Sequence, residues 1–493
     1  MGERRVGVTG GGDGAGHSAG QAMPHGPSRR ALLGASLAAG AVAGTGVWRS
    51  AAAQGVTKTG RRVARARHAS ATPAARALRA PGSLPYPELA AGTDTIPEIQ
   101  HIVVLMMENH SYDNHLGMLG RHGADGFTLA ADGKPTAANP YPDGKIQHAF
   151  RMPTTCQLSG KPSQTWVDSH TQVAGGHMNG FVKSGSGPVA MGYWEKADLP
   201  FYYSMASTFP IADQYHCSVL GQTFPNRRYL LAATSLGMIN DGVPDPFDYP
   251  ANGTIFERLH KADIDFADYY SLLDSFLPTA TMGLFPEDLV KYGDHLHEID
   301  HFFDAAKSGT LPGFSLVEPD YTKSSEEDPQ NIAYGEQFAA QVIDAVMTGP
   351  GWKNTLLVWT FDEHGGYYDH VVPPAAIAPD DIPPNGSPAY TGFRQYGIRV
   401  PCAVISPWAR SDYVSHEVMD HTSILALVEA KWNLPAMTHR DANAHNMLDM
   451  LDFKDAAFRT PPKLAKPLID TDPSALACNT KGPGTIPPPG SVT

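Results

Sequence analysis

Two acidic residues that could hold a metal ion follow an apolar run in the C-terminal half of the chain. Asp362 and Glu363 come directly after residues 356–361, a β-prone run that is too short for a helix. Such a run predicts a strand buried on both faces, and open α/β sheets bind ligands where their strands end. Adjacent carboxylates repel each other unless a cation or protons compensate them. The pair therefore predicts a metal site; the alternative is an N-cap in an ordinary acidic loop.

A second strand is expected to deliver matching groups to the same place. Residues 101–107 form another apolar run, and Glu108 and Asn109 follow it directly. Two strands that end in acid and amide groups are a stronger signal than either strand alone, because both ends can lie on one rim of the sheet.

Thr223 is expected at the start of a helix. Pro225 suits the first helical turn, and the residues that follow it favour helix. Backbone N–H groups and the helix dipole stabilise an anion such as a phosphate at this position. The alternative is that Thr223 merely caps the helix.

The histidines are weaker signals. A lone histidine such as His170 is more often a satisfied or solvated side chain than a catalytic one. His295, His297 and His301 alternate with apolar residues at helical spacing, so we expect a solvated helix face rather than a metal site.

Composition indicates a soluble globular protein that is not directed at nucleic acid. The chain has 493 residues, of which 42% are hydrophobic and 18% charged, and its formal net charge is −13. This charge argues against nucleic acid as the main partner. The four cysteines form no CxxC pair, which argues against a structural zinc site. If the protein is exported, one or two disulfides fit, in pairings that the sequence leaves open.

The N-terminal residues have the pattern of an export signal. Arg29 and Arg30 precede an Ala/Gly-rich apolar run that ends near Val47, and residues 51–53 supply small side chains for cleavage. The run is too short and too rich in glycine to predict a membrane span. The twin arginine resembles a Tat signal, so we expect export through the Tat machinery to the periplasm, the cell surface or the medium. An uncleaved leader is the alternative.

Strand and helix patterns alternate from about residue 99 to residue 453, which predicts one doubly wound α/β domain. A helix is expected over 329–347, a strand over 400–407 and another helix over 421–432. The predicted organisation is an export signal, a mobile basic and Pro/Ala-rich arm, one folded domain and a Pro/Gly-rich tail, over residues 1–53, 54–97, 98–456 and 457–493.

Four ordered motifs together resemble one family. They are residues 107–113 (MENHSYD), 222–227 (QTFPNR), 361–366 (FDEHGG) and 368–370 (YDH). They are similar to the bacterial phosphoesterase family of phosphatidylcholine-hydrolysing phospholipases C and acid phosphatases. The resemblance covers roughly residues 99–453, which makes 98–456 a phosphoesterase catalytic domain. It implies an alkaline-phosphatase-like α/β/α sandwich around a mostly parallel sheet.

The resemblance assigns roles to individual residues. It implies that Thr223 is the nucleophile and that its oxygen also meets the metal. The implied metal ligands are Glu108, Asn109, Asp362 and Glu363. Carboxylate and amide ligands favour a hard divalent cation such as calcium, magnesium or manganese, with zinc and iron left open.

Two histidines are implied as further catalytic groups, and two expected histidines are missing. His170 would bind phosphate or assist proton transfer, and His370 belongs to the Asp-His motif, which leaves its role open. Family histidines are expected where this chain has Gln164 and Asp328. These departures leave the proton donor to the leaving group unassigned.

The resulting expectation is an exported, metal-dependent phospholipase C that acts on phosphatidylcholine-like phosphodiesters. The alternatives are an acid phosphatase acting on phosphomonoesters and a non-catalytic surface binding protein, which would be expected to lack the nucleophile or the ligands. A sulfatase would need a Cys-x-Pro-x-Arg motif, which this chain lacks. The expected partners are a phospholipid or small phosphoester and, transiently, a membrane surface. Aromatic candidates for membrane contact are Trp166, Phe181, Tyr193 and Trp194, although core packing is the expected role for most of them.

Overall fold

A nine-stranded sheet forms the centre of the molecule in the computed structural model, which describes residues 78–468, except 157, 159 and 274–276, and residue 488. The strand order is β13 (Val414–Ser415), β6 (Ile211–Ala212), β12 (Cys402–Ile405), β11 (Thr355–Phe361), β1 (His101–Met107), β10 (Phe314–Val317), β7 (Phe266–Leu273) and β8 (Leu277–Thr279), with β9 (Leu296–Glu298) paired to β7. Strands β11, β1, β10 and β7 are parallel, and β12 is antiparallel to β11. The predicted mostly parallel sheet is confirmed.

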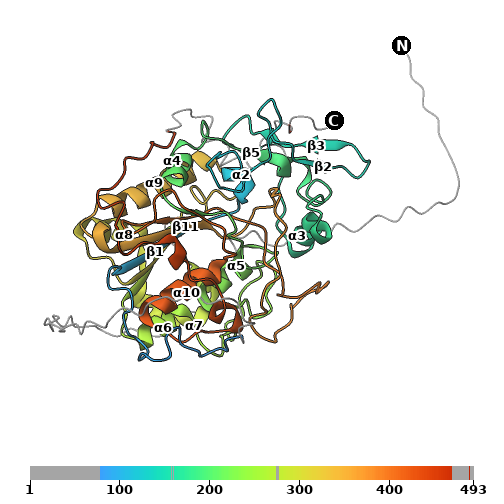
Figure 1. Cartoon of the computed structure of the whole chain (residues 1–493). Coiled ribbons are helices and arrows are strands. Elements are labelled where there is room, and N and C mark those ends of the chain that lie inside the picture. Colours follow the sequence, from blue (N-terminus) through green and yellow to red (C-terminus); the bar gives the residue numbers. More distant parts are fainter. Residues whose placement is uncertain (1–77, 157, 159, 274–276, 469–487, 489–493) are drawn as a thin grey trace, which may run out of the picture.

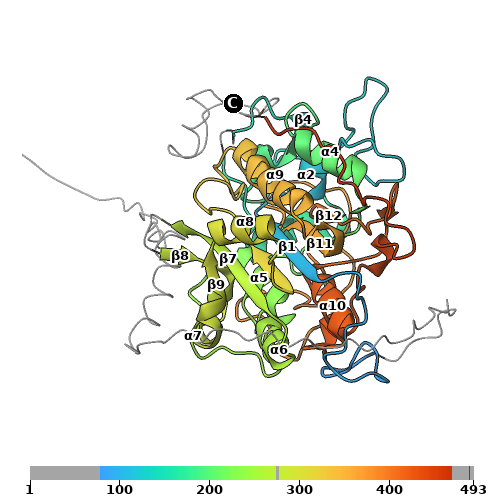
Figure 2. The same ribbon diagram turned by 90° about the vertical axis from the view of Figure 1, so that its left-hand side faces the viewer.

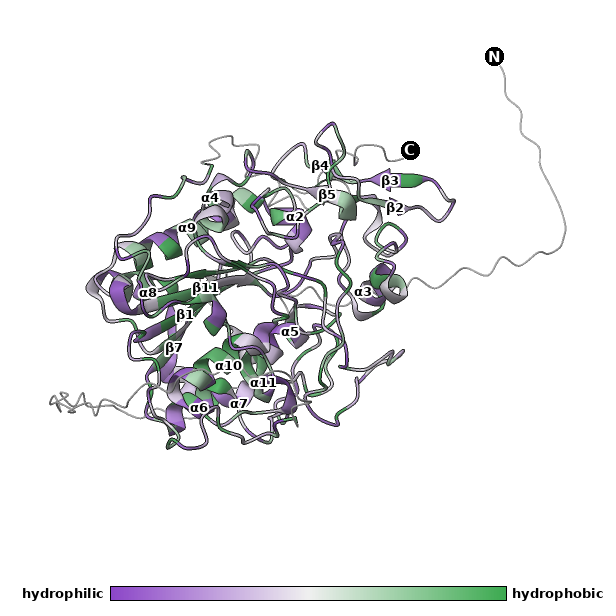
Figure 3. Ribbon diagram, in the orientation of Figure 1, coloured by the Kyte–Doolittle hydropathy of each residue, from purple (hydrophilic) through white to green (hydrophobic). Residues whose placement is uncertain are grey.

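Helices cover both faces of this sheet (Figures 1 and 2). One layer holds α2 (Tyr112–Leu116), α4 (Pro200–Thr208), α8 (Ile299–Ser308) and α9 (Ile332–Thr348). The other holds α5 (Thr223–Ala232), α6 (Ile255–Lys261), α7 (Pro286–Tyr292) and α10 (His421–Trp432). Figure 3 shows that β11 and α10 are hydrophobic over much of their length, as expected for elements buried between the layers. The α/β/α sandwich is therefore confirmed.

Smaller elements surround the ends of the central strands. They are α3 (Trp166–Val173), α11 (His439–Ala442), the β2 (Ala138–Pro140) and β3 (Ile146–His148) hairpin, and the pair β4 (Phe150–Arg151) and β5 (Gly192–Tyr193). No helix in the described ranges is both long and apolar enough to cross a bilayer.

The register of the two central strands aligns the predicted metal ligands. Strands β1 and β11 pair in parallel from His101 with Thr355 to Met107 with Phe361. The Asp362 N–H then donates to the Met107 carbonyl at 3.1 Å. The acidic and amide residues that follow each strand therefore leave the sheet side by side, as predicted.

The expected helix face of histidines is wrong for two of its three members. His295 ends a short 3-10 turn and His297 lies in β9, and only His301 lies on α8. The His295 Nδ1–H donates to the Phe266 carbonyl at 2.8 Å, and the His295 ring stacks on the Phe266 ring. The polar–apolar alternation here belongs to a short strand, because β9 pairs in parallel with β7.

The folded unit extends beyond the predicted domain at both ends. Residues 78–97, predicted to belong to a mobile arm, pack near the end of α10, where Gly82 N–H donates to the Ala436 carbonyl and Thr95 N–H to the Lys431 carbonyl, both at 2.8 Å. Phe458 accepts a hydrogen bond from Trp352 Nε1 at 3.0 Å. The predicted signal and the first part of the arm, residues 54–77, lie outside the described residues.

Candidate active site

The turns that follow β1 and β11 lie in close contact and are joined by the Asp362 side chain. Asn109 N–H and Glu363 N–H both donate to Asp362 Oδ1, at 3.2 and 2.8 Å, and Gly365 N–H donates to Glu363 Oε2 at 2.8 Å. Asn109 has a φ of 69° and Gly365 a φ of 66°, both in the left-handed region. A Cβ atom on Gly365 would lie 1.8 Å from the Asn109 carbonyl oxygen. The close contact of the two turns therefore requires glycine at this position.

The four predicted metal ligands lie on these two turns, which we call the acidic turn, and all four are buried. Glu108, Asn109, Asp362 and Glu363 are at most 2% exposed. Neither Oδ1 nor Nδ2 of Asn109 has a hydrogen-bond partner among the described residues. Burying an amide without a partner is costly, whereas a bound cation would satisfy its oxygen. The carboxylate and amide oxygens thus fit a hard divalent cation, whose identity the geometry leaves open.

Arg227 connects helix α5 to the acidic turn. Its Nε lies 3.0 Å from Asp362 Oδ2, and its Nη1 lies 3.6 Å from Glu318 Oε2. Burial alone would lower the pKa of Arg227, but the surrounding acidic groups outweigh burial and raise it. The guanidinium therefore stays charged and fixes α5 relative to β11. Sequence reasoning assigned Arg227 no role, although its position four residues after Thr223 already placed both on one helix face.

Thr223 is the first residue of α5, and the N-cap is Gln222. The alternative that Thr223 is the capping residue is therefore not supported. Phe224 N–H donates to Asp241 Oδ1 at 2.8 Å, and Gln222 Nε2 lies 3.2 Å from Asp241 Oδ2. Thr223 is 3% exposed, one turn before the residue that contacts Asp362, on the same helix face.

His170 lies on α3, which contacts the acidic turn through a different residue. Gln172 Oε1 accepts a hydrogen bond from His364 Nε2 at 2.7 Å. The His170 Nδ1–H donates to the Trp166 carbonyl at 2.7 Å, and its ring stacks on Tyr390 with centroids 3.8 Å apart. Burial lowers the pKa of His170. The proton-transfer role of His170 stays a prediction.

Comparison with known proteins agrees with this arrangement of motifs. The model of the Phosphoesterase family matches residues 99–435. The chain belongs to the phosphoesterase family. It is a hydrolase that acts on phosphoric ester bonds, and the predicted resemblance is confirmed.

Relatives of this phosphoesterase occur in bacteria and plants. Phospholipase C A of Mycobacterium tuberculosis is 30% identical over 451 residues, which cover 80% of this chain and 86% of that protein. Non-specific phospholipase C6 of Arabidopsis thaliana is 31% identical and covers 72% of each chain. A solved alkaline phosphatase superfamily protein from Vibrio parahaemolyticus is 11% identical, with a TM-score of 0.36 and coverage of 75% of this chain and 72% of that one.

The Asp-His motif of this phosphoesterase forms a separate ionic network. His370 Nδ1 lies 2.7 Å from Asp113 Oδ2, and His370 Nε2 lies 3.2 Å from Asp125 Oδ1. Arg399 contacts Asp369 at 2.9 Å and Asp113 at 3.2 Å. Burial opposes the charge of His370, but the hydrogen bond and charge of Asp113 raise its pKa to about 9. His370 is therefore an imidazolium at neutral pH, and the structure places it on Asp113 rather than on the predicted metal ligands.

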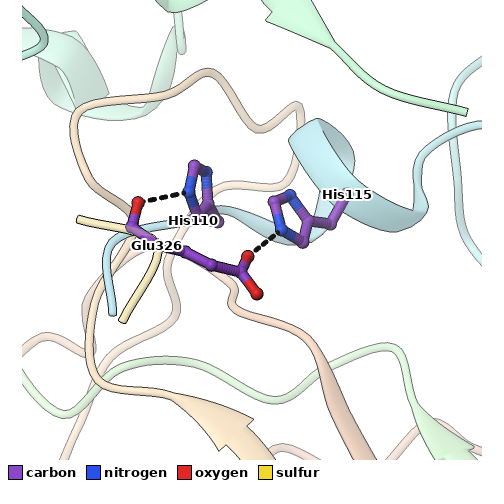
Figure 4. A group of neighbouring side chains, drawn as sticks. All are labelled: His110, His115 and Glu326. Carbon is purple, nitrogen blue, oxygen red and sulfur yellow. Dashed lines mark hydrogen bonds and ion pairs between the residues drawn. The ribbon is translucent and has the colours of Figure 1, made fainter. Parts of the chain in front are cut away.

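His110, His115 and Glu326 form a third cluster (Figure 4). The rings of His110 and His115 stack with their centroids 4.2 Å apart, and the Nδ1 atoms lie 2.8 and 2.9 Å from Asn114 Oδ1. His115 Nε2 lies 2.7 Å from Glu326 Oε2, and His110 Nε2 lies 3.0 Å from the Glu326 carbonyl. Sequence reasoning did not single out this group.

Burial keeps that cluster neutral. It lowers the pKa of His110 to about 4 and raises the pKa of Glu326 well above its ordinary value. The protonated Glu326 carboxyl then donates to His115 Nε2. These atoms could surround an ion, but they already bond to one another. Glu108 N–H donates to the Ser325 carbonyl at 2.9 Å, so we interpret the cluster as a support that holds Glu108 in place.

Proposed function

We propose that this phosphoesterase is an exported, metal-dependent phospholipase C that cleaves phosphatidylcholine-like phosphodiesters with Thr223 as the nucleophile. The observation that carries the proposal is the link from α5 to the acidic turn. Arg227 joins Asp362 one helical turn after Thr223. The names of the relatives, phospholipase C A and non-specific phospholipase C6, support the choice of substrate.

The proposed reaction proceeds in two steps at phosphorus. The Thr223 oxygen attacks the phosphorus, the bond to the diacylglycerol oxygen breaks, and the leaving alkoxide takes up a proton. A phosphorylated Thr223 that still carries the head group results. Water then attacks the same phosphorus, Thr223 leaves as its hydroxyl, and phosphocholine is released.

A divalent cation held by Glu108, Asn109, Asp362 and Glu363 would stabilise the threonine alkoxide and polarise a phosphoryl oxygen. The protein's own residues do the positioning. Thr223 stands at the N-terminus of α5, where the helix dipole would favour the negative charge of a phosphate. Arg227 orients Asp362 through the hydrogen bond from its Nε.

Two histidines, His170 and His370, are candidates for the proton donor to the leaving group. His370 carries a proton at neutral pH because its pKa is raised to about 9. His170 is mostly neutral, because burial lowers its pKa. Protonation at rest favours His370 as the acid, and this assignment predicts that His370→Gln lowers the rate most for substrates with poor leaving groups.

Export through a Tat-type route is part of the same proposal. It rests on Arg29 and Arg30 in the N-terminal sequence. The disulfide of Cys156 supports it, because such bonds persist in oxidising compartments. Replacing both arginines with lysine in the producing cell should keep the protein inside. Unchanged export would overturn this part.

The test of function uses the purified protein on phosphatidylcholine and on para-nitrophenyl phosphate, each with and without a chelator. Faster release of phosphocholine that is lost on chelation is the expected result. A preference for the monoester would instead identify an acid phosphatase. Full activity with all metal removed would overturn the metal requirement, and no activity on either ester would favour a non-catalytic binding protein.

A further inference from the structure

Two loops that contact residues of the candidate active site each carry exposed apolar side chains. The first loop, residues 239–250, carries Phe247, which is 91% exposed, and the exposed Val243. The second loop, residues 374–392, carries the exposed Ile382 and Tyr390. Large apolar side chains this exposed mark an interaction surface when they are grouped.

The two loops contact each other and both reach the candidate active site. Asn385 N–H on the second loop donates to the Gly237 carbonyl, just before the first loop, at 2.7 Å. Asp241 of the first loop accepts the Phe224 N–H next to Thr223. Tyr390 of the second loop stacks on His170. A partner on these loops would thus lie next to the phosphoryl-transfer residues.

The charges on the loops restrict the partner. Residues 239–250 and 374–392 contain no lysine or arginine. Their charged residues are Asp241, Asp245, Asp248, Asp380 and Asp381. An anionic membrane is bound through clusters of basic residues, which are absent from these loops. Apolar and aromatic side chains without basic neighbours fit the interface of an electrically neutral lipid surface.

We propose that these two loops form a docking surface for a zwitterionic lipid bilayer, with Phe247, Val243 and Ile382 inserting at the level of the head groups. This inference rests on the proposed phospholipase function and extends it to how the enzyme meets its substrate. It also corrects the expected membrane contacts. Trp166, Phe181, Tyr193 and Trp194 are all buried.

The test measures binding to vesicles separately from turnover. The full chain with Thr223→Val, which should leave the lipid intact, is sedimented with vesicles of phosphatidylcholine and with vesicles that also contain phosphatidylglycerol. The test variant adds Phe247→Ser and Ile382→Ser. The matched control adds Ile146→Ser, an exposed residue on the β2–β3 hairpin.

Removing two inserted side chains should weaken binding to neutral vesicles on the order of tenfold to a hundredfold, given the transfer free energy of a buried Phe or Ile side chain. The control should bind like its parent. Turnover is measured in proteins that retain Thr223, on vesicles and on a soluble phosphocholine ester. The ratio of the first rate to the second should fall by a similar factor in the double variant and should not change in the control.

Other outcomes overturn the docking surface without touching the proposed function. The docking surface is wrong if the protein hydrolyses the soluble ester but does not sediment with neutral vesicles. It is also wrong if the double variant and its parent sediment equally. Tighter binding to anionic vesicles would also contradict it. A dimer in solution that the double substitution dissociates would make this surface an interface between two copies. Conversely, the protein could bind vesicles, lose this binding in the double variant and hydrolyse no ester. That result would support the docking surface and contradict the phospholipase function.

Discussion

The same two chain segments, residues 108–113 and 362–370, build two acidic clusters that differ in charge balance. In the first, Glu108, Asp362 and Glu363 lie with the guanidinium of Arg227 and with the amide of Asn109, which has no hydrogen-bond partner among the described residues. In the second, two buried aspartates and the more exposed Asp125 bind Arg399 and the protonated His370.

The difference indicates what each cluster is for. Buried charges that match one another can hold a structure together, although their net stabilisation is modest. In the first cluster, a bound cation would compensate buried carboxylates and satisfy the Asn109 oxygen. The charges of the cluster around Arg399 thus balance one another within the protein, and the cluster around Asp362 fits a cation and a phosphoester.

The largest expected effect is at the nucleophile beside the first cluster. Thr223→Val should lower kcat on the order of 10⁶-fold, as for the loss of another hydroxyl nucleophile, because the attacking oxygen is gone. Thr223→Ser keeps a hydroxyl and should retain part of the activity. Steady-state turnover and thermal unfolding check both variants. Wild-type turnover by Thr223→Val would remove Thr223 as nucleophile.

Matched substitutions separate the two clusters directly. Asp362 and Asp369 are both fully buried and each contacts a buried arginine, at 3.0 and 2.9 Å. Asp362→Asn should lower both metal content and rate. Asp369→Asn should keep the metal but destabilise the fold by about 3 kcal/mol, because it leaves Arg399 with less compensating charge.

Metal analysis of the purified proteins and denaturant unfolding measure these two effects. If Asp369→Asn loses the metal while Asp362→Asn keeps it, the roles of the two clusters are reversed. Equal metal loss in both variants would mean that the clusters act as one site.

The contact between the two turns can be tested at Gly365. Gly365→Ala should destabilise the protein by at least about 2 kcal/mol and weaken metal binding, because the new Cβ collides with the Asn109 backbone. Gly144→Ala is the control, since Gly144 also has a positive φ but has open space around it. Similar stability losses at both positions would show that backbone conformation alone, and not the turn contact, explains the effect.

The smallest expected effect is a pH dependence from the second cluster. The pKa of His370 is raised from 6.5 to about 9, so its stabilising contribution is complete below pH 6.5 and is lost as the pH rises through 9. The loss should be on the order of 1–2 kcal/mol, because the ring is partly exposed and screened. In His370→Gln the free energy of unfolding should change less over this range. An identical pH profile in both proteins would show that His370 is not the titrating group.

The sequence predicted the sheet and its ligand edge because these follow from local patterns. Strands β1 and β11 are largely apolar runs, and α9 has apolar residues at helical spacing and ends before Gly349 and Pro350. The predicted acidic and amide residues lie together because parallel neighbouring strands end at one edge.

The parts that were missed depend on distant partners. The Arg227–Asp362 pair joins residues 135 positions apart, and the His115–Glu326 pair joins residues 211 apart. No local pattern encodes such contacts. His297 was misassigned for the same reason, since its strand exists only where β7 provides an edge. The roles of Thr223, His170 and His370 stay predictions.

Helix α5 is shielded from solvent, since all ten of its residues are buried. Its amide hydrogens should therefore exchange with solvent only when the whole domain opens, at the free energy of global unfolding. A nucleophile carried on such a helix cannot be repositioned by local fraying. The two loops that meet the substrate can thus vary in sequence while the geometry at Thr223 is kept constant by the core.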